Sequence, residues 1–272
     1  MIVASPTIRH PENGALRSGD VGIGAVYGPA MISPDRIDAV VFDMGGVFAV
    51  PAPGPVSELV GAAGVEIELD DAAARLAHYA GVAALTGALV DGEVRETDPA
   101  VWDAYDRAYF GSAGLAGEAL GTAVVARHAA RISGDSAAIW SHVLVENREA
   151  FARISERRPT AIVTNNNGTA EQQCLDMKIC QLGAGPLPQV AAIVDSTVIG
   201  IAKPDPAIFS PALDALGTDA GRTLYVGDTV HADVRGATAA GMPVVQLDPF
   251  DFHDSHDHWR LPDVVALAEH LA

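Results

Sequence analysis

Short runs of apolar, largely β-branched residues recur along the chain from position 39 onward. The runs are almost continuously apolar rather than alternating, which is typical of strands buried on both faces of a parallel sheet. We therefore expect strands at 39–44, 160–165, 189–196, 223–228 and 243–248.

Stretches with helical periodicity separate most of these runs. They lie at about 168–180, 205–216, 231–240 and 262–271. Strand and helix in regular alternation predict an α/β fold, in which right-handed crossovers build a three-layer, Rossmann-like parallel sheet.

The interval between the first two runs breaks this alternation, because it contains no convincing strand. Its helical patterns cover 69–80, 101–110, 118–132 and 136–155. We interpret 56–145 as an inserted all-helical domain, with 36–55 and 146–272 forming the sheet-containing core. Residues 1–35 are rich in Gly, Pro and Ser without a sustained period, and we expect them to be a mobile extension.

Charge and hydropathy narrow the possible partners. The 35 acidic residues exceed the 17 Lys and Arg, and the resulting charge of −18 would repel nucleic acid and anionic lipid. No apolar run approaches the roughly 20 residues that span a bilayer, and the first residues do not resemble a secretory signal. We therefore expect a cytoplasmic protein with no nucleic-acid or membrane partner. Its oligomeric state stays open.

The two cysteines agree with a reducing compartment. Cys174 and Cys180 lie six positions apart in a predicted helix, which would place them about 240° apart around its axis. We therefore expect two free thiols that cannot bridge each other.

Polar residues follow the predicted strands. Asp43 ends the first strand and Thr164 the second, Lys203 follows the third, and Asp228 and Asp233 follow the fourth. Each alone has a structural explanation as a helix cap or turn residue. In an open parallel sheet, however, the ligand crevice lies outside the carboxyl ends of the strands, so we expect these residues to converge there.

Four segments, FDMGGV, IVTN, AKPDPAIF and VGDTVHAD, together resemble the motifs of the haloacid dehalogenase-like hydrolases, which are mostly phosphatases. The resemblance extends over about 38–248. It implies that the helical insertion is the cap that covers the active site in one large subgroup of this family.

The resemblance also implies roles for individual residues. Asp43 would attack phosphorus and form an aspartyl-phosphate. Mg²⁺ would be held by the Asp43 carboxylate, the Gly45 carbonyl and Asp228, while Asp233 would orient a metal-bound water or Lys203.

The remaining motif residues would handle the phosphoryl group. Lys203 would neutralise Asp43 and the transferring oxygens. Thr164, the backbone N–H of Asn165, and Gly46 would bind the phosphoryl group of a small phosphorylated metabolite.

Position 45 departs from the family pattern. Family phosphatases usually carry a second Asp there, which acts as general acid and base, whereas this chain has Gly45. Loss of a positioned acid typically costs a factor of about 10²–10⁴ in rate. This favours substrates with good leaving groups: anomeric, acyl or aryl phosphates. His231 is a candidate substitute for the missing acid.

Two other functions are compatible with the motifs. A metal-free 2-haloacid dehalogenase would also use Asp43, although Asp228 and Asp233 would then add nothing. A catalytically weak or inactive ligand-binding relative is kept open by Gly45. The His-rich stretch 251–259 is expected to be a solvated loop, and Trp102, Tyr105, Tyr109 and Phe110 to pack inside the insertion.

Overall fold

The computed structural model describes residues 32–88, 99–133, 139–253 and 257–272. Within these residues a six-stranded sheet has the order β10-β9-β8-β1-β4-β7, and every neighbouring pair is parallel. The strands are β1 (Ala39–Phe42), β4 (Thr160–Thr164), β7 (Ile193–Asp195), β8 (Thr223–Gly227), β9 (Val244–Leu247) and β10 (Trp259–Leu261). The predicted α/β, Rossmann-like fold is thus confirmed. Most of the predicted extension, 1–31, lies outside the described residues.

Alternate side chains of β1 enter different hydrophobic cores. Val40 and Phe42 pack in one core, whereas Val41 packs in the other. The first core is covered by α5 (Val145–Ser155) and α10 (Val264–His270), and the second by η3 (Pro206–Phe209), α8 (Ser210–Leu216) and α9 (Gly236–Ala239). Burial on both faces explains why the strand is apolar throughout.

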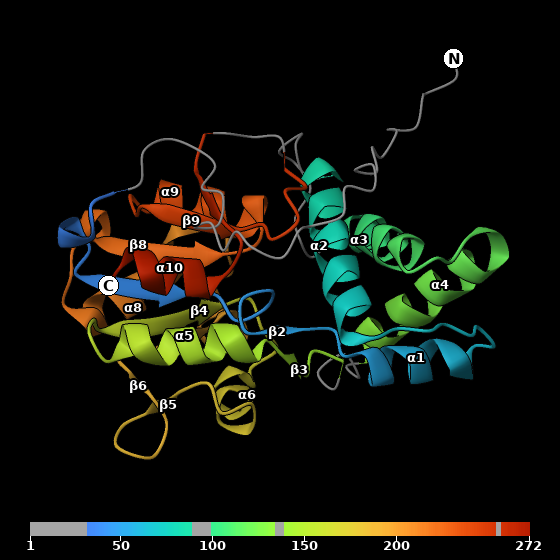
Figure 1. Ribbon diagram of the computed structural model, residues 1–272, viewed down its shortest axis with the longest axis horizontal. Helices are drawn as coiled ribbons and strands as arrows, with labels where there is room; N and C mark the ends of the chain where they lie inside the picture. Colours follow the sequence, from blue (N-terminus) through green and yellow to red (C-terminus); the bar gives the residue numbers. More distant parts are fainter. Residues whose placement is uncertain (1–31, 89–98, 134–138, 254–256) are drawn as a thin grey trace, which may run out of the picture.

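The helices α1 (Pro53–Ala62), α2 (Asp71–Ala88), α3 (Pro99–Ser112) and α4 (Gly117–Ser133) form a separate group, here called the helical unit. They share their own hydrophobic core, to which Val56 and Val60 of α1 contribute, so the unit begins slightly before position 56. An antiparallel pair, β2 (Ala49–Val50) and β3 (His142–Val143), joins it to the sheet. Figure 1 shows the unit beyond one end of the strands.

Three predicted elements are shorter than the sequence indicates. The expected strand 189–196 divides into β6 (Gln189–Val190), which pairs with β5 (Gln181–Leu182) in a separate small sheet, and β7. Within the described residues 139–155, the expected helix 136–155 is limited to α5, because a turn and β3 precede it. The expected helix 231–240 is divided into the π-helix η5 (Val230–Arg235) and α9.

The expected helix 168–180 also ends early. The prediction that Cys174 and Cys180 lie in one helix is therefore wrong. The observed helix, α6 (Ala170–Asp176), stops before Lys178, which has a positive φ of 56°. Cys180 therefore lies beyond the helix, and its thiol is close enough to hydrogen-bond with Cys174. This contact and burial raise the pKa of Cys180. Both thiols are free and buried.

The short helices α7 (Ser196–Ile199), η1 (Pro34–Arg36) and η4 (Ala220–Arg222) complete the described elements. No described helix combines the length and the apolar character needed to cross a bilayer.

Candidate active site

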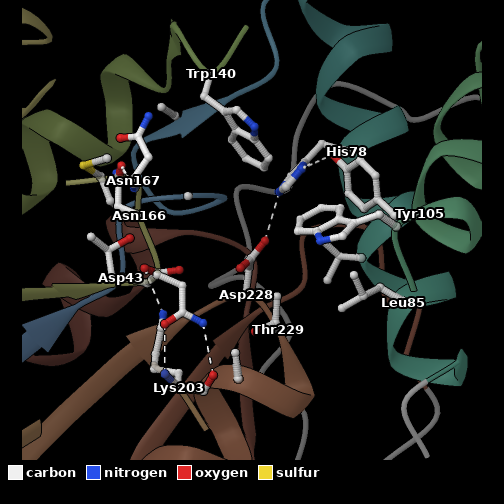
Figure 2. A pocket seen from close by; sticks show the side chains of 18 of the residues that line it. Asp43, His78, Leu85, Tyr105, Trp140, Asn166, Asn167, Lys203, Asp228 and Thr229 are labelled. Atoms are coloured by element: carbon white, nitrogen blue, oxygen red, sulfur yellow. Dashed lines mark hydrogen bonds and ion pairs between the residues drawn. The ribbon is translucent and has the colours of Figure 1, made fainter. Parts of the chain in front are cut away.

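The predicted motif residues converge at the carboxyl edge of the sheet. A cavity of about 310 Å³ is lined there by Asp43, Gly45, Thr164, Lys203 and Asp228. Figure 2 shows Asp43, Lys203 and Asp228 on one side of it and residues of the helical unit on the other. The convergence expected from parallel-strand geometry is therefore observed.

Lys203 lies between Asp43, the predicted nucleophile, and the buried acid Asp233. Its Nζ lies 2.9 Å from Asp43 Oδ1 and 2.7 Å from Asp233 Oδ1, and it donates a 3.0 Å hydrogen bond to the Tyr225 hydroxyl. Burial alone would lower the pKa of Lys203, but Asp233 and Asp43 outweigh it and raise the pKa above its usual value. The lysine is thus held charged beside Asp43.

Asp233 is saturated by donors from the protein. Its Oδ1 accepts from Lys203 and from the Tyr225 hydroxyl at 2.9 Å. Its Oδ2 accepts from the Asp228 N–H at 3.2 Å and from the Thr229 N–H and Oγ1 at 2.9 and 2.7 Å. A carboxylate has about four lone-pair sites, so these five donors leave Asp233 no free position for a cation.

Asp43 and Asp228, in contrast, carry negative charge that the protein compensates only in part. The contact of Asp43 Oδ1 with Lys203 is an ion pair without hydrogen-bond geometry, and this buried oxygen has no hydrogen-bond partner. Burial raises the pKa of Asp43 to about 7, against the opposing effect of Lys203. Burial and the charge of Asp233 raise the pKa of Asp228 well above its usual value.

Asp43 and Asp228 lie close enough together, beside the saturated Asp233, to hold one cation. One carboxylate oxygen from each of Asp43, Asp228 and Asp233 lies within 4.8 Å of the other two. When ionised, the three carboxylates carry more negative charge than Lys203 neutralises, and the buried Asp43 Oδ1 has no hydrogen-bond partner. The donor set consists of hard oxygens, which fit Mg²⁺.

The two glycines after Asp43 have different positions. Gly45 lines the cavity, and a Cβ there would meet only the Trp140 ring, at 3.5 Å. Gly46 has a φ of +66°, and a Cβ on it would lie 1.9 Å from Asp228 Oδ2. The turn therefore requires glycine at position 46 for steric reasons.

The assignment of Gly46 to substrate binding stays a prediction, and the contacts of Gly46 suggest a structural role. Gly46 is not among the residues that line the cavity. Its N–H donates to the Ala49 carbonyl at 2.8 Å, and its carbonyl accepts a 2.6 Å hydrogen bond from the Tyr79 hydroxyl. Both backbone groups are thus used to shape the loop.

Thr164 and Asn165 lie where β4 ends, and both line the cavity. The Asn165 side chain accepts from the Lys203 N–H at 2.9 Å and donates to the Lys203 carbonyl at 3.1 Å. This clamp fixes the backbone of Lys203 relative to β4, a function that the sequence did not reveal.

His78 of α2 enters the site from the helical unit. Its Nε2 lies 2.9 Å from Asp228 Oδ2, and its Nδ1 lies 2.9 Å from the Tyr105 hydroxyl (Figure 2). Burial, with a smaller effect of Arg127, lowers the pKa of His78 to about 3, so the ring is neutral at pH 7. A neutral imidazole has one N–H; when Nε2 donates to the carboxylate, Nδ1 accepts from Tyr105.

His78 was missed because a lone histidine in a predicted apolar helix is ordinarily a packing residue. The polar residue inside AARLAHYAG was the one available signal. His231, the candidate substitute for the missing acid, does not line the cavity. It is partly exposed and lies 3.5 Å from Arg235.

The expectation of a solvated loop at 251–259 holds for Asp251, Phe252 and Asp257, which are exposed, but not for the two described histidines. His253 and His258 are buried and contact Gln246, whose side chain also donates a 3.0 Å hydrogen bond to the Asp228 carbonyl. Through Gln246, this network holds the backbone carbonyl of Asp228 in place. His256 lies outside the described residues.

The aromatic residues of the insertion pack in its core, and two of them also line the cavity. Tyr105, Tyr109 and Phe110 are buried in the core of the helical unit, as expected. Trp102 and Tyr105 also line the cavity.

Comparison with known proteins identifies the family. Residues 37–241 match the hydrolase family described as haloacid dehalogenase-like hydrolase. The match covers most of the chain, and the protein belongs to this family. The resemblance inferred from the four motifs is thereby confirmed.

Curated relatives at the sequence level are phosphatases. The chain is 35% identical over 105 residues to a phosphoserine phosphatase of Thermus thermophilus, covering 39% of this chain and 41% of that protein. It is 41% identical over 66 residues to a phosphoglycolate phosphatase of Mesorhizobium japonicum, covering 24% and 28%. The matched region spans less than half of each relative.

A solved structure shares the fold. The HAD-hydrolase YfnB from Bacillus subtilis, solved bound to magnesium, superimposes with a TM-score of 0.56 at 17% identity. The likeness covers 87% of this chain and 99% of YfnB. At this identity it supports the fold alone.

Proposed function

We propose that this protein is a magnesium-dependent phosphatase that hydrolyses a small phosphorylated metabolite through an aspartyl-phosphate on Asp43. One observation carries the proposal: the buried Asp43 carboxylate faces the cavity with Lys203 Nζ at 2.9 Å and Asp228 in the same acidic cluster. A candidate nucleophile, a buried lysine and an acidic cluster that could hold a metal ion thus lie together at the edge of the sheet.

The reaction has two displacements. In the first, an oxygen of Asp43 forms a bond to phosphorus and the bond from phosphorus to the leaving oxygen breaks. In the second, a water oxygen forms a bond to phosphorus and the bond from phosphorus to Asp43 breaks, which releases inorganic phosphate and regenerates the carboxylate; the proton lost by the water passes to solvent. Lys203 offsets the repulsion between Asp43 and the phosphoryl oxygens, and Thr164 and the Asn165 N–H hold the phosphoryl group in line.

The metal ligands follow from the fit of the acidic cluster. Asp43, the Gly45 carbonyl and Asp228 would hold Mg²⁺, which would neutralise charge on the transferring phosphoryl group. The saturated Asp233 acts differently, because it keeps Lys203 and the Asp228–Thr229 backbone in place.

Gly45 determines the preferred leaving group. Of the cavity-lining residues that the structure describes, the acids are Asp43 and Asp228. Each has a role that requires its ionised form, and neither replaces the general acid missing at position 45. Substrates whose leaving oxygen needs no proton, such as anomeric, acyl and aryl phosphates, should therefore react best.

The helical unit is proposed to be the cap of this active site. It is inserted between β1 and β4, and His78, Tyr105 and Trp140 bring its side chains or its exit segment to the cavity. In this proposal 36–55 and 146–272 form the catalytic core and 56–145 the cap, with the first residues of α1 at the boundary.

A hydrolysis screen tests the function. The substrates are p-nitrophenyl phosphate, acetyl phosphate, glucose 1-phosphate and glycerol 3-phosphate, each with Mg²⁺ and with EDTA. We expect release of phosphate that requires Mg²⁺, with the first three above the alkyl ester. Halide release from a 2-haloacid in EDTA, without phosphatase activity, would overturn the proposal in favour of a dehalogenase; no turnover of any of these compounds would leave a ligand-binding relative.

A further inference from the structure

Besides Asp43, Asp228 and Lys203, the cavity is lined by two guanidinium groups of α4, those of Arg127 and Arg131. Arg127 is only 2% exposed and lines the same cavity as Asp43. Its Nη1 has no hydrogen-bond partner. A buried charged donor without a partner is costly, and such groups are normally paired.

We infer that the substrate carries a carboxylate in addition to its phosphoryl group, and that Arg127 binds this carboxylate. The inference rests on the proposed phosphatase function and names the substrate class of the same site. The sheet supplies Asp43, Lys203 and Thr164 to one side of the cavity, whereas the helical unit supplies Arg127 to the other. A ligand whose phosphoryl group lies at Asp43 therefore directs its remaining atoms toward Arg127.

The charges around Arg127 support an anionic ligand. The neighbouring acid, Asp106, accepts two hydrogen bonds from Arg131, one to each oxygen. Arg127 Nε reaches the same carboxylate only at 4.0 Å. One carboxylate thus faces two guanidinium groups, and a local charge of about +1 remains by the ordinary charges of these groups.

This positive charge lies within a protein whose formal charge is −18. The local charge of about +1 matches the single negative charge of a carboxylate. A second phosphate would bring a charge of about −1.5 to −2 at neutral pH. The planar guanidinium also matches the two oxygens of a carboxylate.

Aromatic rings of the helical unit pack against the two guanidinium groups. Arg127 lies over the Tyr109 ring with its Cζ 5.8 Å from the ring centre, and Arg131 lies over Trp102 at 4.6 Å. Arg131 is already committed to Asp106 and Trp102, so the unpaired Nη1 of Arg127 is the group left to recognise a ligand.

Matched aryl phosphates test this inference. The ratio of kcat/KM is measured for 4-carboxyphenyl phosphate against 4-carbamoylphenyl phosphate, and for the 3-substituted pair, because each pair differs mainly in the charge. A hydrogen bond to a charged group should make at least one pair favour the carboxylate by about 10- to 100-fold. This ratio needs no variant and stays informative if a variant does not fold.

Three variants test whether the preference for the carboxylate substrate depends on Arg127. Arg127→Met should bring the carboxylate-to-amide ratio close to one, and Arg127→Lys should retain part of the preference. Arg107→Met is the matched control, because Arg107 is exposed on α3 and pairs with Asp103, and its ratio should equal that of the wild type. Circular dichroism and thermal melting check that each variant is folded.

The outcomes separate this inference from the proposed function. Equal kcat/KM for both members of both pairs, in an enzyme that hydrolyses p-nitrophenyl phosphate, would overturn the carboxylate inference alone. A preference for 1,4-phenylene bisphosphate over the carboxylates would also overturn it. Absence of Mg²⁺-dependent hydrolysis of every ester, p-nitrophenyl phosphate included, would overturn both.

Discussion

His78 of α2 and Asp228 after β8 are 150 positions apart in sequence, and their side chains lie 2.9 Å apart in the cavity. The next residue, Tyr79, donates a 2.6 Å hydrogen bond to the Gly46 carbonyl. One turn of the helical unit thus contacts both a proposed metal ligand and the loop that follows the proposed nucleophile. The orientation of Asp228 therefore depends on a residue outside the sheet.

Replacing His78 should weaken the metal site. His78→Ala removes the partner of Asp228 Oδ2, and loss of such an orienting contact typically lowers metal affinity about 10- to 100-fold. The Mg²⁺ dependence of p-nitrophenyl phosphate hydrolysis measures this as a shift of the activation midpoint. His231→Ala is the control, since that histidine lies outside the cavity. An unchanged midpoint in His78→Ala would show that the contact does not position Asp228.

Gly46→Ala should disrupt the site although it adds only a methyl group. The new Cβ would occupy space 1.9 Å from Asp228 Oδ2, at a φ of +66° that favours glycine. We expect a lower melting temperature and a loss of Mg²⁺-dependent activity of at least about 10-fold, as for other lost ligand-orienting contacts. Gly54→Ala, where a Cβ meets nothing within 4 Å, should change neither. Wild-type behaviour of Gly46→Ala would refute the steric account.

Gly45→Asp should restore a proton donor. The Cβ position is open apart from the Trp140 ring at 3.5 Å, so the backbone can accept a side chain there. A positioned acid typically contributes about 10²–10⁴ in rate, and the gain should be largest for glycerol 3-phosphate. Gly45→Asn has the same shape without the acid. If both variants changed the ratio of alkyl to aryl ester hydrolysis equally, proton transfer would not be the cause.

The raised pKa of Asp43 predicts a pH-dependent stability change in EDTA. Burial raises this pKa to about 7 from an ordinary 3.8, so the folded state disfavours the ionised carboxylate. In the unfolded chain this carboxyl ionises at a lower pH than in the folded protein. The free energy of unfolding therefore falls between about pH 4 and pH 7 and stays lowered above pH 7. Asp43→Asn should thus melt at a higher temperature than wild type at pH 8, and this difference should shrink toward pH 4. A constant difference across this range would contradict the shifted pKa.

The sequence was sufficient to predict the sheet and the acids at its edge. Strands buried on both faces are apolar at every position, as Val40, Val41 and Phe42 show, and parallel topology then brings Asp43, Lys203 and Asp228 together. Element ends were harder, because local conformations such as the positive φ of Lys178 end α6 early.

The contribution of the helical unit was not predictable in the same way. His78 and Arg127 lie in helices whose periodicity indicates only a packed face. Which residues face the sheet depends on how the unit docks, and no local pattern encodes that. Likewise, the saturation of Asp233 and the pairing of both Gly46 backbone groups follow from tertiary contacts.

Acid-quenched turnover tests the central claim most directly. The protein is mixed with Mg²⁺ and an aryl phosphate, quenched within a single turnover, and mapped by peptide mass spectrometry. We expect phosphate on Asp43 in the wild type, with neither this adduct nor turnover in Asp43→Asn. Full phosphatase activity in Asp43→Asn, or turnover by the wild type with no phosphorylated Asp43 at any quench time, would contradict the aspartyl-phosphate mechanism.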